Sequence, residues 1–258
     1  EKWLDPTMTY SSALFPREGA PLAEGQAHKY RALAQAIDLK PGDRVLEIGS
    51  GWGGFAEFAA REFGADVTGL TISPAQLDYA SQRIQRQGLA ERARFRLCDY
   101  RDVDGQFDKI ASIEMFEAVG REYWPCYFAK VRETLKPGGA AGLQIITIAD
   151  RLFDHYASGA DFIQRYVFPG GMLPSPSILR RQVADAGLDF RPTTTFGLDY
   201  ARTLKEWRER FAASWRDIQA LGFDSRFEKL WRFYLSYCEA GFRAATTDVC
   251  QVVAVRPA

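Results

Sequence analysis

Histidine is scarce in this sequence of 258 residues, which contains only His28 and His155. The cysteines show no CxxC spacing and no metal-binding pattern, so we expect no zinc site or other metal centre. We expect reduced cysteines that fill buried space in a cytoplasmic protein. They are Cys98, Cys126, Cys238 and Cys250.

An excess of one charge is also missing, because 33 lysines and arginines balance 33 aspartates and glutamates. The net charge of zero excludes a protein that binds nucleic acid through bulk positive charge, although it leaves room for a local basic patch. No apolar run reaches the roughly 18 residues of a membrane-spanning helix, and the start of the sequence lacks a signal-peptide pattern. Because the sequence starts at Glu1 rather than at a methionine, we expect that upstream residues are missing from it.

Apolar residues make up 47% of the sequence and charged residues 26%, which is typical of a folded globular protein. The length predicts a single large domain over residues 1–258. Aromatic residues reach 14%, which favours an apolar or cationic ligand.

Short apolar segments alternate with amphipathic segments along the first 150 residues. This alternation predicts a doubly wound α/β fold with a parallel sheet and helices on both faces. We predict strands at 44–48, 66–70, 93–97, 107–113, 140–148 and 248–255. We predict helices at 20–39, after Gly54, from Ser73 onward, and at 121–135, 176–187, 203–221 and 224–244, with an irregular, aromatic-rich stretch at 150–180.

Three glycines follow the first predicted strand, at Gly49, Gly51 and Gly53. Glycine allows the backbone to approach a ligand closely at the end of such a strand. The GxGxG spacing differs from the GxGxxG of dinucleotide-binding proteins, and no lysine completes a P-loop. The loop is therefore either a ligand site or a tight turn without a ligand, and Glu47 suits an acid that organises the turn and a cationic ligand.

Polar residues also follow the second and third strands. The usual ribose-binding acid is missing after the second strand, where Thr71, Ser73 and Gln76 are the hydrogen-bonding candidates and Ser73 also suits a helix cap. Asp99 suits either a contact with an adenine amino group or a solvated position, and Tyr100 suits packing on the adenine ring. The missing acid and the glycine spacing argue against an NAD-dependent dehydrogenase.

Taken together, these segments resemble class I S-adenosylmethionine-dependent methyltransferases, and more narrowly the cyclopropane-fatty-acyl-phospholipid synthase family. The glycine loop alone identifies only the superfamily, whereas the combination of segments is specific to the family and extends over nearly the whole chain. The further matching segments are Met8–Phe15 (MTYSSALF), Ser112–Glu117 (SIEMFE), Tyr166–Ser175 (YVFPGGMLPS), Tyr234–Leu235 and Gly241–Arg243.

The resemblance implies methylation, by S-adenosylmethionine, of a double bond in an unsaturated acyl chain of a phospholipid, followed by closure of a cyclopropane ring. It places Tyr10 and Ser11 over the cofactor and Glu114 beside its methionine part, whereas the residues alone also allow a surface acid at Glu114. The cofactor contacts that it implies are Tyr10, Ser11, Gly49, Ser50, Gly51, Gly53, Thr71, Ile72, Ser73, Gln76, Asp99, Tyr100, Ile113 and Glu114.

The resemblance also implies a bound bicarbonate that removes a proton from the transferred methyl group. Glu117, Tyr234 and Ile146 match family residues of this site. Ser12 stands where the family has a cysteine, and Gln144 where it has a histidine. These two side chains can donate hydrogen bonds to an anion but supply no imidazolium charge, so bicarbonate binding is in doubt.

The altered site leaves the product open between a cyclopropane and a methyl-branched or methylene chain, as in branched-chain or furan fatty acid pathways. A small-molecule N- or C-methyltransferase and a catalytically silent binding protein are the other readings, and the paired acids Glu114 and Glu117 suit an amine substrate. His155 matches no family base, and we expect it in an exposed loop. Arg243 either pairs with a phosphate, stabilises Glu117 or lies on the surface without a role in the site.

The segments 150–180 and 203–244 are expected to form the acyl-chain channel, with Tyr166, Phe168, Pro169 and Gly170 lining it, and residues 1–40 to cover the cofactor and substrate. Family members usually carry an upstream lipid-binding domain, which this sequence does not contain. The resemblance therefore implies a cytoplasmic protein at the inner membrane face that acts on phospholipid acyl chains, with a homodimer as one option and no role for nucleic acid.

Overall fold

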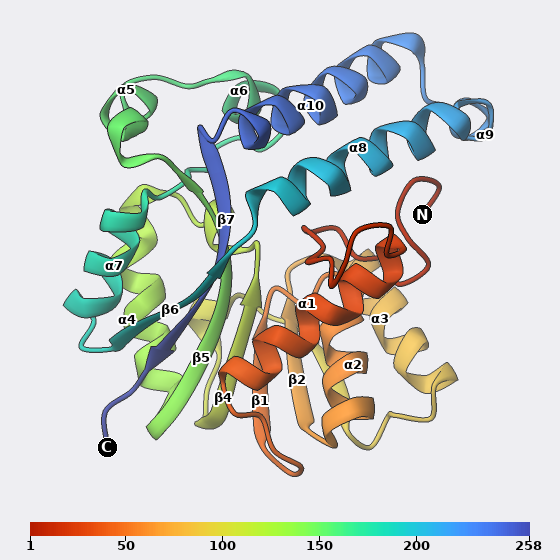
Figure 1. Cartoon of the computed structure of the whole chain (residues 1–258). Coiled ribbons are helices and arrows are strands. Elements are labelled where there is room, and N and C mark those ends of the chain that lie inside the picture. Colours follow the sequence, from red (N-terminus) through yellow and green to blue (C-terminus); the bar gives the residue numbers. More distant parts are fainter.

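A computed structural model describes residues 1–258 as a central sheet of seven strands with helices on both faces (Figure 1). The strand order is β3-β2-β1-β4-β5-β7-β6. The predicted α/β fold is confirmed, but the sheet is mixed rather than parallel, because β7 runs antiparallel to both β5 and β6. The strands are β1 (Arg44–Ile48), β2 (Asp66–Thr71), β3 (Ala93–Leu97), β4 (Phe107–Ile113), β5 (Leu135–Ile148), β6 (Asp189–Thr195) and β7 (Thr247–Val255).

Helices cover both faces of the sheet, with α1 to α3 on one face and α4 and α7 on the other (Figure 1). Each face buries its own apolar core, one around Leu33 and Phe55 and the other around Trp124 and Phe128. None of the helices combines the length and the apolar composition needed to cross a membrane. They are α1 (Leu22–Ala36), α2 (Gly54–Phe63), α3 (Pro74–Arg86), α4 (Trp124–Thr134), α5 (Phe153–Ala157), α6 (Phe162–Tyr166), α7 (Pro176–Asp185), α8 (Gly197–Ala213), α9 (Trp215–Ala220) and α10 (Ser225–Arg243).

A third layer lies over the carboxyl ends of the parallel strands. It consists of α5, α6, α8, α10 and the N-terminal segment, which Figure 1 shows above the sheet. Its core is aromatic: Trp207 is fully buried, and Trp3, Tyr10 and Tyr200 pack their rings against it at centroid distances of 5.5, 5.3 and 6.2 Å. This layer therefore roofs the edge of the sheet where ligands of α/β proteins bind.

Some predicted boundaries were wrong. Strand β6 was missed because it is an edge strand with mostly exposed residues, and Pro192 lies beside a register shift in its pairing with β7. Strand β5 already begins at Leu135 and runs through the Pro-Gly-Gly that was expected to precede it. The helix predicted at 203–221 starts earlier, at Gly197, and breaks at Ser214, while the irregular stretch contains the short helices α5 and α6.

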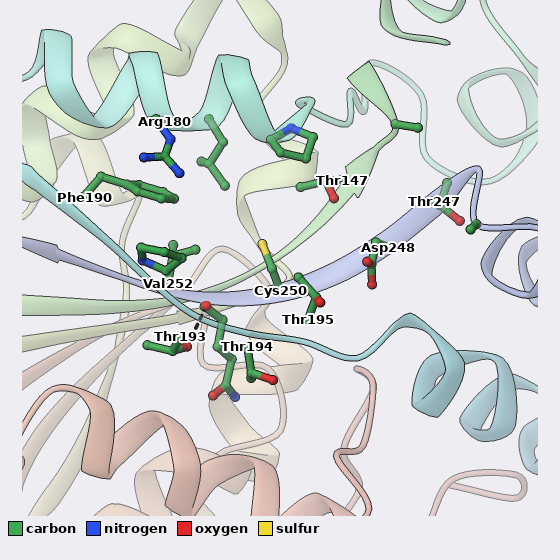
Figure 2. Close-up of a pocket in the computed structure, with 16 residues that line it drawn as sticks. Thr147, Arg180, Phe190, Thr193, Thr194, Thr195, Thr247, Asp248, Cys250 and Val252 are labelled. Atoms are coloured by element: carbon green, nitrogen blue, oxygen red, sulfur yellow. Dashed lines mark hydrogen bonds between the residues drawn. The ribbon is translucent and has the colours of Figure 1, made fainter. Parts of the chain in front are cut away.

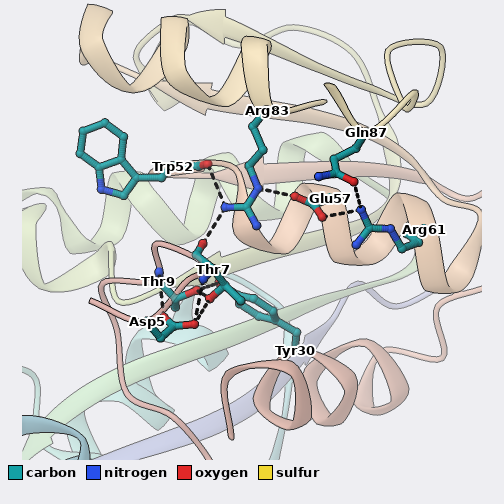
Figure 3. A network of polar contacts seen from close by, with 9 residues as sticks. All are labelled: Asp5, Thr7, Thr9, Tyr30, Trp52, Glu57, Arg61, Arg83 and Gln87. Atoms are coloured by element: carbon teal, nitrogen blue, oxygen red, sulfur yellow. Dashed lines mark hydrogen bonds and ion pairs between the residues drawn. The ribbon is translucent and has the colours of Figure 1, made fainter. Parts of the chain in front are cut away.

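Polar contacts attach the N-terminal segment to the body of the protein (Figure 3). The guanidinium of Arg83, on α3, forms an ion pair with Glu57 of α2 and donates a hydrogen bond of 2.6 Å to the Thr7 carbonyl. The same group reaches the Trp52 carbonyl beside the glycine loop at 3.4 Å. Thr9 is held in turn by the hydroxyl of Tyr30 at 2.9 Å. Residues 5–9 are thereby fixed next to the glycine loop.

Candidate active site

The glycine loop continues directly from β1. Gly49, Gly51 and Gly53 all have positive φ values, of 81°, 51° and 81°. A Cβ atom at Gly49 would lie 2.6 Å from the side chain of Met115, whereas one at Gly51 would meet nothing within 4 Å. The loop thus packs tightly on its inner side and leaves open space outside Gly51, where a ligand can approach the backbone.

The predicted residues after β2 lie together beside this space. Thr71 donates a hydrogen bond of 2.7 Å to the Gln76 side chain, and the Ser73 hydroxyl caps α3 by accepting from the Gln76 amide. The backbone amide of Gln76 is used in this way, whereas its side-chain Nε2 atom has no protein acceptor. Ile72 is 77% exposed although it is apolar, and Leu97 at the end of β3 is 54% exposed. Two exposed aliphatic side chains at neighbouring strand ends suit contact with a flat ring.

Asp99 and Tyr100 follow β3 as predicted. The Asp99 carboxylate forms a two-pronged ion pair with Arg101, at 3.0 and 2.8 Å, and these hydrogen bonds hold the pKa of Asp99 below its ordinary value. The Tyr100 ring packs edge-on against Tyr127 at 5.4 Å, and burial raises its pKa to about 12. Both residues therefore stay in one protonation state at neutral pH, Asp99 charged and Tyr100 neutral.

These observations fit S-adenosylmethionine at the carboxyl end of β1 and β2. The open face of Gly51 admits a backbone contact, and Ile72 and Leu97 supply apolar surface for an adenine ring. Glu47, at the end of β1, is buried, which raises its pKa, and its Oε2 atom has no protein partner. Ser50, Gly53 and Ile113 also lie at these strand ends, but Ser50 donates its hydroxyl proton to the Leu70 carbonyl.

Glu114 is the centre of a buried hydrogen-bond cluster. Its backbone is in the left-handed region (φ 51°), which turns the side chain under the N-terminal segment. Its Oε1 atom accepts from the backbone amide of Ser12 and from the side-chain amide of Gln144, both at 2.8 Å. Its Oε2 atom accepts from the hydroxyl of Tyr200 at 2.5 Å. Burial raises the pKa of Glu114, and these donors act in the opposite direction.

Lys29 on α1 is a functional candidate that the sequence analysis missed. Its side chain is fully buried, its Nζ atom donates 2.6 Å to the hydroxyl of Ser11, and its charge acts on Glu114. Burial lowers the pKa of Lys29 from 10.5 to about 7, although Glu114 and Asp5 oppose the shift. A lysine on an amphipathic helix normally faces solvent, so no pattern in the sequence indicates that Lys29 is buried.

Ser12 and Gln144, which stand where the family has a cysteine and a histidine, hydrogen-bond to other groups of the protein in this structure. The Ser12 hydroxyl donates to the Ala13 carbonyl at 2.8 Å, and the Gln144 side chain lies between Glu114 and Gln251. Both residues are fully buried and neither lines the cavity described below. The physical reason is the burial of Glu114. A carboxylate withdrawn from water has to be stabilised by hydrogen-bond donors, and the backbone amide of Ser12 and the side-chain amide of Gln144 provide them.

Glu117 is an acid in the wall of the large cavity. Its Oε1 atom accepts a short hydrogen bond from the backbone amide of Ile146, the group that the resemblance assigns to the bicarbonate. Its Oε2 atom is buried without a protein partner. Burial, with the charge of Glu114 as a second cause, raises the pKa of Glu117 to about 8. A buried carboxylate oxygen without a hydrogen-bond donor binds a proton readily, so Glu117 is a candidate proton acceptor.

The cavity above Glu117 has a volume of about 910 Å³ and is mostly apolar. At one end the hydroxyls of Tyr10 and Tyr234 form a hydrogen bond of 2.9 Å, and burial raises the pKa of both phenols. The expected segments 150–180 and 203–244 supply most of its walls. The lining includes Tyr10, Glu114, Glu117, Ile146, Ile148, Leu152, His155, Tyr156, Ile163, Phe168, Met172, Leu173, Tyr200, Leu204, Tyr234, Tyr237 and Phe242.

Of the four predicted channel residues, only Phe168 lines the cavity. Tyr166 lies on the outer side of α6 and is 64% exposed, while Pro169 and Gly170 form an exposed turn in which Gly170 has a φ of 82°. His155 is exposed as expected, but it belongs to the short helix α5 rather than to a loop and also lines the cavity. Arg243 pairs with Glu239 at 2.9 Å rather than with Glu117, and Cys126 is exposed rather than buried.

A second cavity, of about 430 Å³, lies between α7 and the strands β6 and β7 (Figure 2). Threonines and Arg180 line it, and its Asp248 carboxylate accepts from the Gly197 backbone amide at 2.8 Å. Neither Glu114 nor Glu117 reaches this cavity. Of the predicted catalytic residues, Glu117, Ile146 and Tyr234 line the larger cavity, and none lines the smaller one.

Substituting Gly51 by alanine tests the cofactor site. Gly51 and Gly42 both have positive φ and open space around an added Cβ, but only Gly51 belongs to the loop. We expect each substitution to cost about 1 kcal/mol of stability, and only Gly51→Ala to weaken binding of S-adenosylhomocysteine, by more than tenfold. Urea unfolding and isothermal titration calorimetry measure the two effects. Equal binding by both variants would place the cofactor elsewhere.

The buried Lys29 predicts a pH-dependent stability. Between pH 7 and 10.5 the unfolded chain keeps its proton on Lys29 while the folded protein loses it, so this residue makes the folded state more stable as pH rises. Lys29→Met removes this contribution. When the pH rises from 7 to 9, we expect the free energy of unfolding of the wild type to increase by about 1–3 kcal/mol relative to that of the variant. Urea unfolding at both pH values measures it, with the exposed Lys205→Met as control. A pH-independent difference would contradict the assignment.

Comparisons with known proteins agree with this site. The profile of the family described as "Mycolic acid cyclopropane synthetase" matches residues 1–252. The chain is 40% identical to the tuberculostearic acid methyltransferase UfaA1 of Mycobacterium tuberculosis, with 98% of this chain and 61% of the relative covered. It is 38% identical to the cyclopropane-fatty-acyl-phospholipid synthase of Escherichia coli K12, with 98% and 63% covered. The chain thus spans about three fifths of the length of these relatives.

Solved structures show the same fold. The mycolic acid cyclopropane synthase CmaA1, in a crystal structure described as complexed with SAH and CTAB, superposes with a TM-score of 0.91 at 28% identity, covering 98% of this chain and 92% of the other. The cyclopropane synthase MmaA2 of Mycobacterium tuberculosis gives a TM-score of 0.90 at 29% identity, with the same coverage. The predicted family is confirmed: the chain belongs to the mycolic acid cyclopropane synthetase family of S-adenosylmethionine-dependent methyltransferases.

Proposed function

We propose that this protein transfers a methyl group to a carbon–carbon double bond in an unsaturated acyl chain of a lipid. The observation that carries the proposal is the apolar cavity of about 910 Å³ whose wall includes Glu117, an acid with one carboxylate oxygen that has no protein partner. A long hydrocarbon chain fits such a cavity, because its walls offer few hydrogen bonds. Relatives named for fatty-acid, phospholipid and sphingolipid substrates support a lipid acceptor.

S-adenosylmethionine, when bound, supplies an electrophilic methyl group. The residues of this chain have to exclude water and stabilise the positive charge that develops on the acyl chain. Tyr10, Phe168 and Tyr234 line the cavity with aromatic rings, whose faces attract a cation. The raised pKa values of Tyr10 and Tyr234 keep both phenols protonated, so neither hydroxyl is an anion that traps the carbocation.

Glu117 accepts the proton in this proposal. The π electrons of the double bond would form the new bond to the methyl carbon while the sulfur–methyl bond of bound S-adenosylmethionine breaks and its electron pair stays on the sulfur, which would leave a carbocation on the neighbouring chain carbon. When the new methyl gives its proton to Glu117, the electron pair of that C–H bond closes the ring. When the chain carbon next to the cation gives its proton, the electron pair forms a double bond and the product is a methyl-branched alkene. A methylene product needs a 1,2-hydride shift that moves the cation to the methyl-bearing carbon before the methyl proton leaves. Bicarbonate is not needed for this step, because the donors expected to hold it, Ser12 and Gln144, serve Ala13 and Glu114.

A methylene or methyl-branched product is a second candidate besides the cyclopropane. The altered Ser12 and Gln144 positions favour it, since the proton acceptor is then fixed in the wall at Glu117 rather than carried by a bound anion. An amine substrate is less favoured. Both oxygens of Glu114 already accept hydrogen bonds, from Ser12, Gln144 and Tyr200. Glu114 and Glu117 therefore do not form a pair of free acids that could bind an amine.

A lipid substrate also implies a place for the enzyme. Acyl chains of phospholipids lie in the bilayer, so we propose that the protein works at the inner membrane face as a peripheral protein. Attachment has to come from its surface or from segments outside residues 1–258, because none of its helices suits a membrane span.

Labelled methyl transfer tests the function. The purified chain is incubated with an oleoyl phospholipid in detergent and S-adenosylmethionine carrying a CD3 group, and the acyl chains are examined by mass spectrometry and NMR. We expect one added carbon with two deuterium atoms for a cyclopropane or a methylene product, which ring and olefinic resonances separate. Three retained deuterium atoms mean that the proton left the chain, giving a methyl-branched alkene. The absence of any labelled lipid would refute the lipid acceptor.

Glu117 predicts the pH profile of the same reaction. Its pKa of about 8 means that only a minority of the enzyme carries the required carboxylate at neutral pH. We expect the single-turnover rate to rise about tenfold from pH 6 to pH 7 and to level off above about pH 8. Glu117→Gln, which keeps the size of the side chain, should lower the rate by at least a hundredfold. A flat profile, or strict dependence on added bicarbonate, would rule out direct proton transfer to Glu117.

A further inference from the structure

Aromatic side chains gather on the outer surface of α6 and α10. This set, here called the α6–α10 patch, consists of Phe162, Tyr166, Phe168, Phe233 and Tyr237. Four of its members are strongly exposed, Tyr166 to 64%, Phe233 to 53%, Phe168 to 43% and Tyr237 to 42%. Phe168 and Tyr237 also line the large cavity, so the patch borders the opening of that cavity.

The rings of the patch touch one another across the two helices. Phe162 contacts Tyr166 at a centroid distance of 5.5 Å, Phe233 at 4.6 Å and Tyr237 at 5.8 Å. Figure 1 shows α6 beside α10 above the sheet, away from the helices that cover its faces. Contiguous exposed aromatic surface is uncommon on a soluble domain and marks an interaction site.

Unpaired cations flank the rings. Arg226 and Lys229 on α10 are exposed, and neither forms an ion pair. They recur with Phe233 and Tyr237 at spacings of three and four residues, which places all four on one face of the helix. Arg165 of α6 is likewise exposed and unpaired, next to Tyr166 in the sequence.

The acids of α10 lie on its other face. Glu228 pairs with Arg232, and Glu239 pairs with Arg208 of α8 and with Arg243. Asp161, which is next to the patch, caps α6 by accepting from the backbone amide of Gln164 at 2.9 Å. The Asp161 carboxylate also accepts from the hydroxyl of Tyr237 at 3.4 Å. The surface near the cavity opening therefore combines aromatic rings with three unpaired cations, Arg165, Arg226 and Lys229, beside the acid Asp161.

We propose that the α6–α10 patch docks on an anionic phospholipid bilayer. The proposal rests on the lipid-methylating function given above and adds the surface through which the substrate is reached. Aromatic rings settle at the headgroup level of a bilayer, and arginines and lysines beside them attract anionic lipids. Docking in this orientation places the cavity opening against the membrane. An acidic carrier protein would use the cations but has no need of exposed rings.

Vesicle binding without cofactor tests the proposal. The full 258-residue chain is sedimented with vesicles of phosphatidylglycerol and phosphatidylcholine in equal amounts, and with vesicles of phosphatidylcholine alone. We expect Arg226→Glu/Lys229→Glu to weaken binding to the anionic vesicles at least tenfold. We expect Tyr166→Ser/Phe233→Ser to weaken binding to both kinds of vesicle. Tyr166 and Phe233 lie outside the cavity lining, so their loss leaves the cavity wall unchanged.

Matched controls carry the same changes elsewhere. Arg86→Glu/Arg94→Glu reverses two exposed, unpaired cations of α3 and β3, and Leu198→Ser removes an apolar side chain that is 70% exposed on α8. We expect wild-type vesicle binding from both. Equal losses from the controls and from the patch variants would overturn the proposal, as would vesicle binding that needs the cations but not the rings, because charge attraction alone would then account for the binding.

Methylation of phospholipid dispersed in detergent separates this proposal from the function on which it rests. If the docking proposal is right, the patch variants methylate dispersed lipid at the wild-type rate and vesicle lipid at least tenfold more slowly. Unchanged rates on vesicles would refute docking through the patch while leaving lipid methylation standing. Intact vesicle binding without methylation of any lipid would instead refute the proposed function.

Discussion

The buried carboxylate of Glu114 joins the parts of this protein that are distant in sequence. Its two oxygens accept from the N-terminal segment at Ser12, from β5 at Gln144 and from α8 at Tyr200, and the charge of Lys29 on α1 acts on it. A charge withdrawn from water requires such partners. The roof over the carboxyl ends of the strands is thus organised around one anion, and Glu117, three residues further on, takes its position in the cavity from the same segment.

The two acids have divided roles for a physical reason. Glu114 is surrounded by donors and is held in a network, whereas Glu117 keeps one oxygen free and has its pKa raised to about 8. Each charge makes the other harder to ionise, so fixing Glu114 as the charged partner leaves Glu117 as the group that exchanges protons. In this molecule Ser12 and Gln144 support the first role rather than the second.

Local signals in the sequence were enough for the sheet, the glycine loop and the resemblance to the family. The apolar runs identified every strand except β6, whose polar edge position and Pro192 conceal it. What failed depends on contacts between distant segments. The buried Lys29 donates to Ser11 of the N-terminal segment, and the Gln144 side chain of β5 donates to Glu114, thirty residues earlier in the chain. Neither can be read from the spacing of residues along the chain.

The antiparallel strand β7 has a consequence for how the chain assembles. It lies between β5 and β6, which both precede it, and residues Ile148 and Thr247 are paired although about a hundred residues separate them. Until β7 is in place, β5 exposes an apolar edge with unpaired backbone groups, and β6 has no neighbour in the sheet. During synthesis from the N-terminus, the first five strands can therefore associate while the molecule is still open to edge-to-edge aggregation. The roof helices α8 and α10 become part of one body only when that last pairing forms.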